Sequence, residues 1–399
     1  MGFKINKSVA VLYLFFLIYF ITYLGERTGL KYASIVILQL YIIFRTGFPR
    51  LRDIDPKLRK IVLLICLALT ISFLFNFSLS GAIKTLSLID LFILSLMMPR
   101  FLNKSKINEL HLIKIIIESL LLALVIAFFT KYNDIIIALG RSSTASVRHL
   151  FGFGYPSIVG FLCYVEFVLS SYLFFSQRKK MTQTLFYIFS ILFSFYMAYL
   201  ADIRAAMISM ILFIMVYMYN FLPKTRTFLC LKVILFSVFF ICSLLYLIGA
   251  SINIENLNYI FSDRFVYYGR AITDVLNKGG LIFGIGAFRN SDVTGLNRIQ
   301  IDNSFIDIFY QYGIIVLLGF VSMIVIMFLK IRKIGSTAVV VKEKPKKYDE
   351  FINSYFVSVL VYSMVEKNLF SLSSALGLVT FLLIFLYIEK YKNIASTFC

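Results

Sequence analysis

Long apolar segments alternate with short polar ones along almost the whole chain. A helix needs about 20 mostly apolar residues to cross a bilayer, with a usual range of about 17–25. On that criterion the pattern predicts about twelve membrane-spanning helices and no independent water-soluble core. We place them at residues 8–24, 30–44, 61–76, 84–98, 112–129, 155–175, 184–200, 205–222, 233–250, 312–329, 352–366 and 373–388.

Composition supports this pattern. Of 399 residues, 60% are hydrophobic and 15% are charged, whereas a soluble domain has about 45–50% apolar and about 25% charged residues. We therefore predict an all-α polytopic membrane protein with a single integral membrane domain, residues 1–399. The first apolar run, 9–24, is not followed by a small-residue cleavage site, so we interpret it as a retained helix rather than a signal peptide.

The formal net charge of +20 could indicate a nucleic-acid partner, but membrane topology explains it better. Placing both termini in the cytoplasm puts most Lys and Arg residues on the cytoplasmic side, as the positive-inside rule requires. We therefore expect no nucleic-acid partner. The five cysteines do not pair at metal-ligand spacing, and no phosphate-binding or dinucleotide-binding motif occurs. The sequence predicts no cofactor and no metal site.

One long polar stretch, residues 251–311, separates the ninth and tenth predicted spans. Our topology makes it a large external loop, and the same topology places Arg148, His149, Arg204 and Glu366 on the external side. Charge near lipid is costly and is kept where a substrate needs it. Arginines and tyrosines gathered on one side of a membrane favour an anionic, hydroxyl-rich substrate such as a lipid-linked sugar pyrophosphate.

Two of these clusters stand beside predicted helix starts. Arg148 could contact a phosphate and His149 could lie near the chemistry, although an ordinary interfacial loop before the helix explains them equally well. Arg204 follows Asp202 at the start of a span and could simply form a local ion pair. However, the small residues that follow it leave room for a long side chain to reach a cavity, and arginine offers planar, bidentate donors to phosphate.

The external stretch contains a segment, 263–270, that predicts a short amphipathic helix. Tyr267 and Tyr268 lie three and four residues after Arg264 and share its face, where tyrosines can stack on sugar rings. Arg270 lies on another face, so we favour Arg264 for a common pocket. The alternative is an interfacial helix with snorkelling arginines. Arg289, farther along the stretch, is a further candidate for substrate binding.

The tenth span begins with a polar stripe. Asp302 or Asn303 makes a good N-cap, and Asn303, Asp307 and Gln311 follow at four-residue spacing on an otherwise apolar helix. Such a stripe must face protein or water rather than lipid. Glu366 lies at the external end of the eleventh span, where a loop ion pair is the alternative to a catalytic role.

Taken in order, these clusters resemble the O-antigen polymerase and ligase superfamily of bacterial envelopes, and within it the Wzy-type polysaccharide polymerases. The segment 148–157 is similar to the family's Arg-x-x-x-Gly-Phe-x-His-Pro-Asn motif, with Tyr155 and Ser157 in place of its histidine and asparagine. Arg204 resembles the family's arginine at a helix start, and Arg264 resembles the arginine before a Gly-x-Gly turn, here 284–286. Asp302 stands where the ligases often carry histidine, which favours a polymerase.

The resemblance implies a metal-independent, inverting glycosyltransferase of the GT-C type in the bacterial cytoplasmic membrane, with its active site outside. Its substrates would be undecaprenyl-pyrophosphate-linked oligosaccharides of capsule, exopolysaccharide or lipopolysaccharide, and a chain-length regulator protein would be a partner. We expect Arg204 and Arg264 to hold the pyrophosphate, and Asp302, then Glu366 or His149, to act as the base. A flippase for the same lipid-linked units, a ligase-type transferase and a non-catalytic assembly subunit remain the alternatives.

Overall fold

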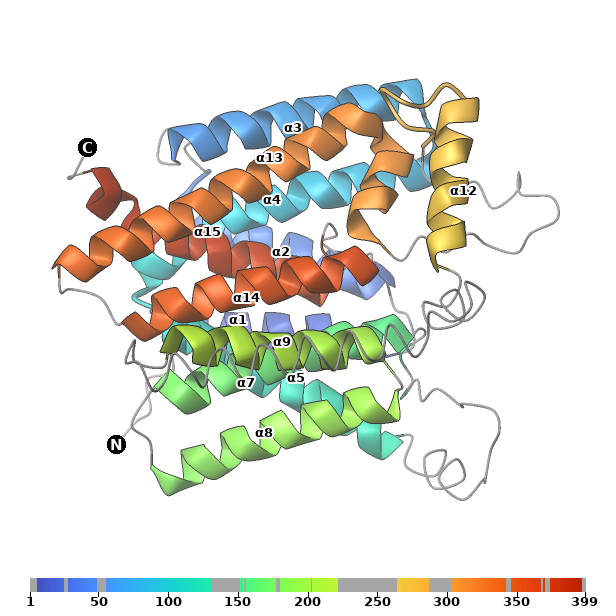
Figure 1. Cartoon of the computed structure of the whole chain (residues 1–399). Coiled ribbons are helices and arrows are strands. Elements are labelled where there is room, and N and C mark those ends of the chain that lie inside the picture. Colours follow the sequence, from blue (N-terminus) through green and yellow to red (C-terminus); the bar gives the residue numbers. More distant parts are fainter. Residues whose placement is uncertain are drawn as a thin grey trace, which may run out of the picture.

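The structure is a computed structural model in which residues 6–24, 28–48, 55–130, 151, 153, 156–176, 180–201, 203–221, 264–286, 303–341, 346–366, 369 and 374–396 are described. These residues form a bundle of long helices (Figure 1). The helices are α1 (Lys7–Ile21), α2 (Thr28–Thr46), α3 (Pro56–Phe75), α4 (Leu79–Ser105), α5 (Glu109–Thr130), α7 (Pro156–Ser176), α8 (Met181–Leu200), α9 (Arg204–Phe221), α12 (Arg264–Asn277), α13 (Ser304–Val341), α14 (Lys346–Val365) and α15 (Ala375–Ser396).

The helices agree with the predicted spans. A helix occupies every predicted span except 233–250, which lies outside the described residues. Within the described part of the chain, seven helices are long and apolar enough to cross a membrane. The protein is therefore an all-α, membrane-embedded protein, whereas the total of twelve spans stays a prediction.

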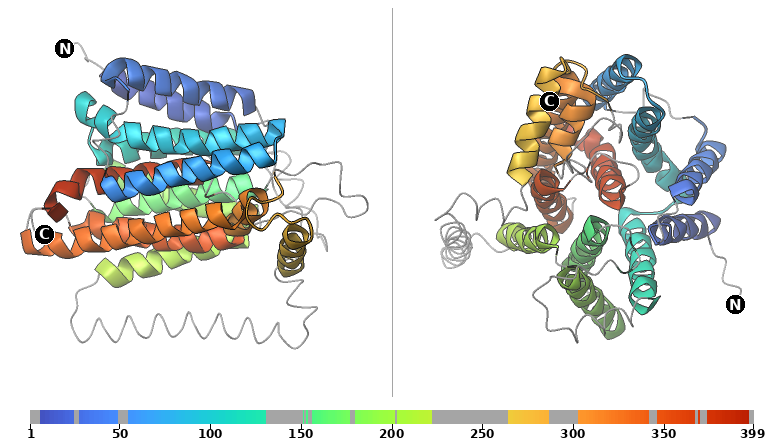
Figure 2. Two further views of the ribbon diagram at one scale, coloured as in Figure 1. Left: turned by 90° about the horizontal axis from the view of Figure 1, so that it is seen from above. Right: turned by 90° about the vertical axis from the view of Figure 1, so that its right-hand side faces the viewer.

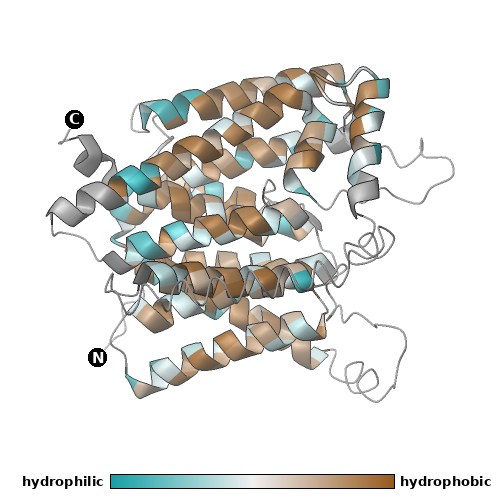
Figure 3. Ribbon diagram, in the orientation of Figure 1, coloured by the Kyte–Doolittle hydropathy of each residue, from teal (hydrophilic) through white to brown (hydrophobic). Residues whose placement is uncertain are grey.

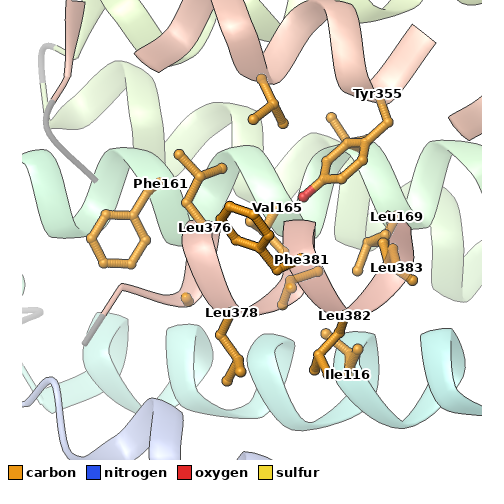
Figure 4. Packing of buried hydrophobic residues seen from close by; sticks show 14 of the residues in the cluster. Ile116, Phe161, Val165, Leu169, Tyr355, Leu376, Leu378, Phe381, Leu382 and Leu383 are labelled. Atoms are coloured by element: carbon orange, nitrogen blue, oxygen red, sulfur yellow. The ribbon is translucent and has the colours of Figure 1, made fainter. Parts of the chain in front are cut away.

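Two helices form the centre of the bundle. Every residue of α15 from Ala375 to Ile388 is buried, and so is every residue of α7 from Val159 to Leu173. Figure 4 shows Leu378 and Leu382 of α15 directed toward α5, with Tyr355 of α14 pointing into the same cluster. A helix that is apolar all round belongs in such a position, and this explains why both segments read as continuous hydrophobic runs.

The outer helices keep large apolar side chains on their outward sides. On α3, Leu63, Leu64 and Leu67 are exposed, and α13 exposes Leu318 and Leu329. Figure 3 shows hydrophobic residues along most of the helix lengths, with hydrophilic residues mainly toward the ends. Contiguous exposed apolar surface on a soluble protein would be a liability, but lipid covers it in a membrane.

The bundle has two distinct ends. At one of them α12 lies across the direction of the other helices (Figure 2). We call it the α12 end. Hydrogen bonds show that α3 and α14 end here and that α13 begins here. Asn76 after α3 donates to the Phe283 carbonyl after α12, and Asn303 before α13 donates to the Met364 carbonyl of α14.

The opposite end is held by polar contacts between helix termini. Asp55, the N-cap of α3, pairs with Lys330 of α13 at 2.5 Å, and its backbone N–H donates to Glu389 of α15. Lys390 pairs with Glu109 of α5 at 2.7 Å. Asn6 joins the same end through Ser105, the last residue of α4. The beginning of α1 and the end of α15 therefore share one end, as an even number of spans requires.

The expected external loop, 251–311, is partly helical. It contains all of α12, and α13 begins at Ser304 rather than at residue 312. The polar stripe in the first turns of α13 lowers the apolar content of that segment, so hydropathy alone predicts a loop there.

Candidate functional site

Arg204 is the first residue of α9, and its side chain is exposed at the α12 end. The residue before it, Ile203, packs on Gly160 of α7. A Cβ atom added to Gly160 would lie only 2.7 Å from the Ile203 side chain, so this close contact requires glycine. The hydroxyl of Tyr362 on α14 approaches the same glycine. Gly160 thus allows the start of α9 and the last turn of α14 to meet, which places Arg204 near the helix end that leads to Glu366.

Glu366 directly follows α14 and is buried, with 4% of its surface exposed. Its carbonyl accepts a hydrogen bond from the Ser304 hydroxyl at 2.7 Å, and that hydroxyl also accepts from the Leu369 N–H. Ser304, the first residue of α13, therefore holds the segment after α14 in place. A buried carboxylic acid beside an exposed end of the bundle is a candidate proton acceptor.

Asn303 caps two helices at once. Its Oδ1 accepts from the N–H groups of Phe305 and Ile306 in the first turn of α13, while its Nδ2 donates to the Met364 carbonyl in the last turn of α14. The first residues of a helix have N–H groups, and the last have carbonyls, without partners inside the helix. The Asn303 side chain provides a partner for both the N–H groups and the carbonyl. Of the two N-cap candidates, Asp302 and Asn303, the structure shows Asn303 in that role.

The polar stripe on α13 continues inward from this cap. Gln311 Nε2 donates to Asp307 Oδ1 at 2.6 Å, one helical turn apart. Gln311 is buried and Asp307 is half-buried. The stripe therefore faces protein rather than lipid, as predicted, and it fixes the Asp307 carboxylate.

A backbone break follows the stripe at Gly313, where φ is +80° and ψ is −174°. The carbonyls of Tyr310 and Gln311 accept hydrogen bonds from the N–H groups of Ile285 and Gly286 instead of continuing the helical pattern. The loop after α12 is thus paired with the broken helix. Irregular backbone inside a membrane bundle is tolerated only where other protein groups satisfy it.

The same loop is attached to α3. Asn76 Nδ2 donates to the carbonyls of Phe283 at 3.0 Å and Gly284 at 3.2 Å, and Ser72 Oγ donates to the Phe283 carbonyl. Gly284 has φ +72°, and a Cβ there would lie 2.4 Å from the Gln311 carbonyl group. The predicted Gly-x-Gly turn is therefore a point of close backbone approach between α12, α3 and α13.

The predicted amphipathic helix at 263–270 is α12, which is longer than expected. Its buried side, Ala271 and Val275, packs against Tyr310 of α13. Arg270 is exposed and Tyr268 is half-buried. These positions leave Arg270 at the surface of the α12 end.

The structure brings Arg204, α12, Asn303, Asp307 and Glu366 to the same end of the bundle. Arg148, His149, Arg289 and Asp302 lie outside the described residues, as do the side chains of Arg264 and Tyr267. Their contacts stay predictions.

The sequence analysis missed Ser72, Asn76 and Ser304, which hold the backbone at this end. The only sequence feature that marks these three residues is their place at the ends of apolar spans. Small polar residues there often form hydrogen bonds to neighbouring backbone groups. Among the described residues, no group of three His, Cys, Asp or Glu side chains could hold a metal ion.

Comparison with models of known protein families gave no match, and comparison with curated protein sequences gave none either.

Proposed function

We propose that the chain is a membrane glycosyltransferase of the GT-C type that polymerises undecaprenyl-pyrophosphate-linked oligosaccharide repeat units. It would act on the external face of the bacterial cytoplasmic membrane. One observation carries the proposal: Arg204, the buried Glu366, the Asn303–Asp307 stripe and the helix that begins with Arg264 share one end of an apolar bundle. Their order along the chain also supports it through the resemblance described above.

The proposed reaction needs a cationic group and a proton acceptor. An acceptor hydroxyl attacks the anomeric carbon of the growing chain, the bond from that carbon to the pyrophosphate oxygen breaks, and the hydroxyl proton passes to a base. Negative charge grows on the leaving pyrophosphate, and fixed arginines can stabilise it. We assign this role to Arg204 and Arg264, assisted by Arg148 or Arg270.

The base is Asp302 in this proposal, with Glu366 and then His149 as the next candidates. A base must reach the proton it takes, either directly or through one water. Glu366 is buried at the same end of the bundle as Arg204, which places a carboxyl group near the proposed pyrophosphate site. Tyr267 and Tyr268 would stack on the sugars, and Asn303, Asp307 and Arg289 would contact their hydroxyls or the phosphates.

Reconstitution tests the proposal. The purified protein is placed in vesicles with lipid-linked repeat units from its host, EDTA is added, and the glycans are separated on a gel. We expect a ladder of chain lengths. Arg204→Ala should lower its rate of formation about 100-fold or more, the effect of removing one preorganised charge-stabilising donor.

Arg332→Ala is the matched control. Arg332 stacks over Phe328 on the part of α13 that reaches the opposite end, 5.7 Å from the ring centroid. It should leave the ladder unchanged. A normal ladder from Arg204→Ala protein, or equal losses in both variants, would overturn the assignment of Arg204.

A transporter of the same lipid-linked units is the second candidate, and the break in α13 favours it. Discontinuous membrane helices often form substrate sites in transporters, and α13 is interrupted at Gly313. Movement of a labelled lipid-linked unit across the vesicle membrane, without any ladder, would support this alternative.

A further inference from the structure

A carboxylic acid lies in the middle of the most deeply buried helix. Glu166 is the central residue of α7, ten residues from either end, and no part of its surface is exposed. Helix α7 packs against α5, α8, α9, α14 and α15. Ionisable residues inside a membrane are rare and are kept for a function or a partner. Glu166 has no part in the reaction proposed above.

Two serines donate to one of its oxygens. Ser170 Oγ on α7 donates to Glu166 Oε1 at 3.2 Å, and Ser190 Oγ on α8 donates to the same atom. The two serine hydroxyls also contact each other at 2.7 Å. The other carboxyl oxygen, Oε2, is buried and makes no hydrogen bond within the described part of the chain.

No cation from the described residues neutralises this group. Among the residues that the structure describes, no Lys, Arg or His forms a salt bridge with Glu166. Two ionisable side chains interact with it electrostatically, Cys163 on α7 and Tyr187 on α8. Tyr187 also interacts with Glu118 of α5.

Among the described residues of the other helices around α7, no cation pairs with Glu166. Of the two acids on α5, Glu118 pairs with Lys114 of its own helix at 3.5 Å, and Glu109 pairs with Lys390 at the opposite end of the bundle. From α9, α14 and α15, the buried ionisable side chains are tyrosines, namely Tyr217, Tyr348, Tyr355, Tyr362 and Tyr387. Within the described part of the chain, a carboxylate at Glu166 would therefore have no cationic partner.

We propose that Glu166 is a proton-binding site at the centre of the bundle, occupied at neutral pH with the proton on Oε2. An ionised carboxylate buried without a cation is far more costly than a neutral acid with one unsatisfied hydroxyl. In the neutral acid Oε1 is the carbonyl oxygen and can still accept from the serines. Such bonds alone favour a carboxylate, so the argument for the bound proton is the complete burial of the group without a cation among the described residues.

The bound proton has a structural consequence for α7 and α8. Release of the proton would leave a bare charge between the two helices, so it must be accompanied by entry of water or a cation, or by separation of α8 from α7. The site is thus suited to couple protonation to movement of α8. The inference does not depend on the proposed glycosyltransferase activity.

Infrared difference spectroscopy of the full-length protein in vesicles tests the proposal, because absorption does not require a reagent to reach the site. Wild-type minus Glu166→Gln should show the carbonyl stretch of a protonated carboxylic acid at neutral pH. Carboxylate bands in place of that stretch, with or without dependence on sodium, would overturn the proposal.

A second pair of variants keeps the test decisive if Glu166→Gln does not fold. Ser190→Ala removes one donor to Oε1 and should move the acid band to higher frequency. Ser194→Ala, one turn farther along α8, is the matched control because its hydroxyl donates to its own helix, at the Ile191 carbonyl. It should leave the band in place. An acid band that neither variant shifts would show that it does not arise from Glu166.

Discussion

Replacing Gly313 with alanine should destabilise the α12 end of the bundle. The φ of +80° costs a non-glycine residue about 1–3 kcal/mol. A Cβ there would also lie 2.2 Å from the Ile282 carbonyl oxygen, so the paired loop must move. Three backbone hydrogen bonds join the loop to α13, donated by Ile285, Gly286 and Ile314. At about 0.5–1.5 kcal/mol each, their loss and the strain together amount to about 3–7 kcal/mol.

The measurement is thermal unfolding of detergent-purified protein in which the other four cysteines are replaced by serine. Unfolding is monitored by the reaction of a thiol-reactive dye with Cys163, which is fully buried in the folded bundle. Gly269→Ala is the matched control, because Gly269 lies within α12 with no heavy atom within 4 Å of a Cβ. It should stabilise the helix by about 0.5–1 kcal/mol. If Gly313→Ala unfolds at the same temperature as Gly269→Ala, the break in α13 does not exist as described.

Three further changes test other contacts. Asn303→Ala removes the N-cap of α13 and the donor to α14 and should cost about 1–2 kcal/mol, seen as a lower Tm. Asn76→Ala frees the loop after α12 and should increase proteolysis within 281–286 without changing cleavage at the opposite end. Burial alone would raise the pKa of Asp55, but the hydrogen bond and ion pair with Lys330 and the bonds from backbone N–H groups hold it below its ordinary value. The resulting stabilisation is complete above the unfolded pKa of about 3.9 and is lost as pH falls through the lower folded value. The Tm of the wild type should therefore fall more steeply below about pH 4 than that of Asp55→Asn, and parallel curves would contradict this reasoning.

The helices could be predicted because lipid imposes a simple requirement of length and apolarity. Their ends could not, because a helix continues past the apolar core wherever polar side chains find partners. Helix α4 shows this: the apolar run stops near residue 98, but the helix continues to Ser105, and Lys104 donates to the Arg45 carbonyl of the neighbouring helix.

The break at Gly313 could not be predicted from any local pattern. It exists because a loop about thirty residues earlier in the chain supplies the hydrogen bonds that a continuous helix would make. The stripe at Asn303 and Asp307 could be predicted, because its spacing is that of a helix and its polarity excludes lipid. The shared end of Arg204 and Glu366 follows from alternating spans, but which side of the membrane that end faces stays a prediction.

Backbone conformation points to the α12 end independently of residue chemistry. At the opposite end, the described residues with left-handed backbone are Gly47 and Lys106, each of which follows a helix, an ordinary way for helices to terminate. At the α12 end they are Phe151, Gly279, Gly284, Gly286 and Gly313. Of these, Gly284 and Gly313 form a loop-to-helix pairing that no helix ending requires. Glycine adopts positive φ without strain, so these two residues mark places where the chain requires a backbone that other residues rarely adopt. The end that collects the proposed arginines and carboxylates is therefore also the end at which the helical pattern is interrupted.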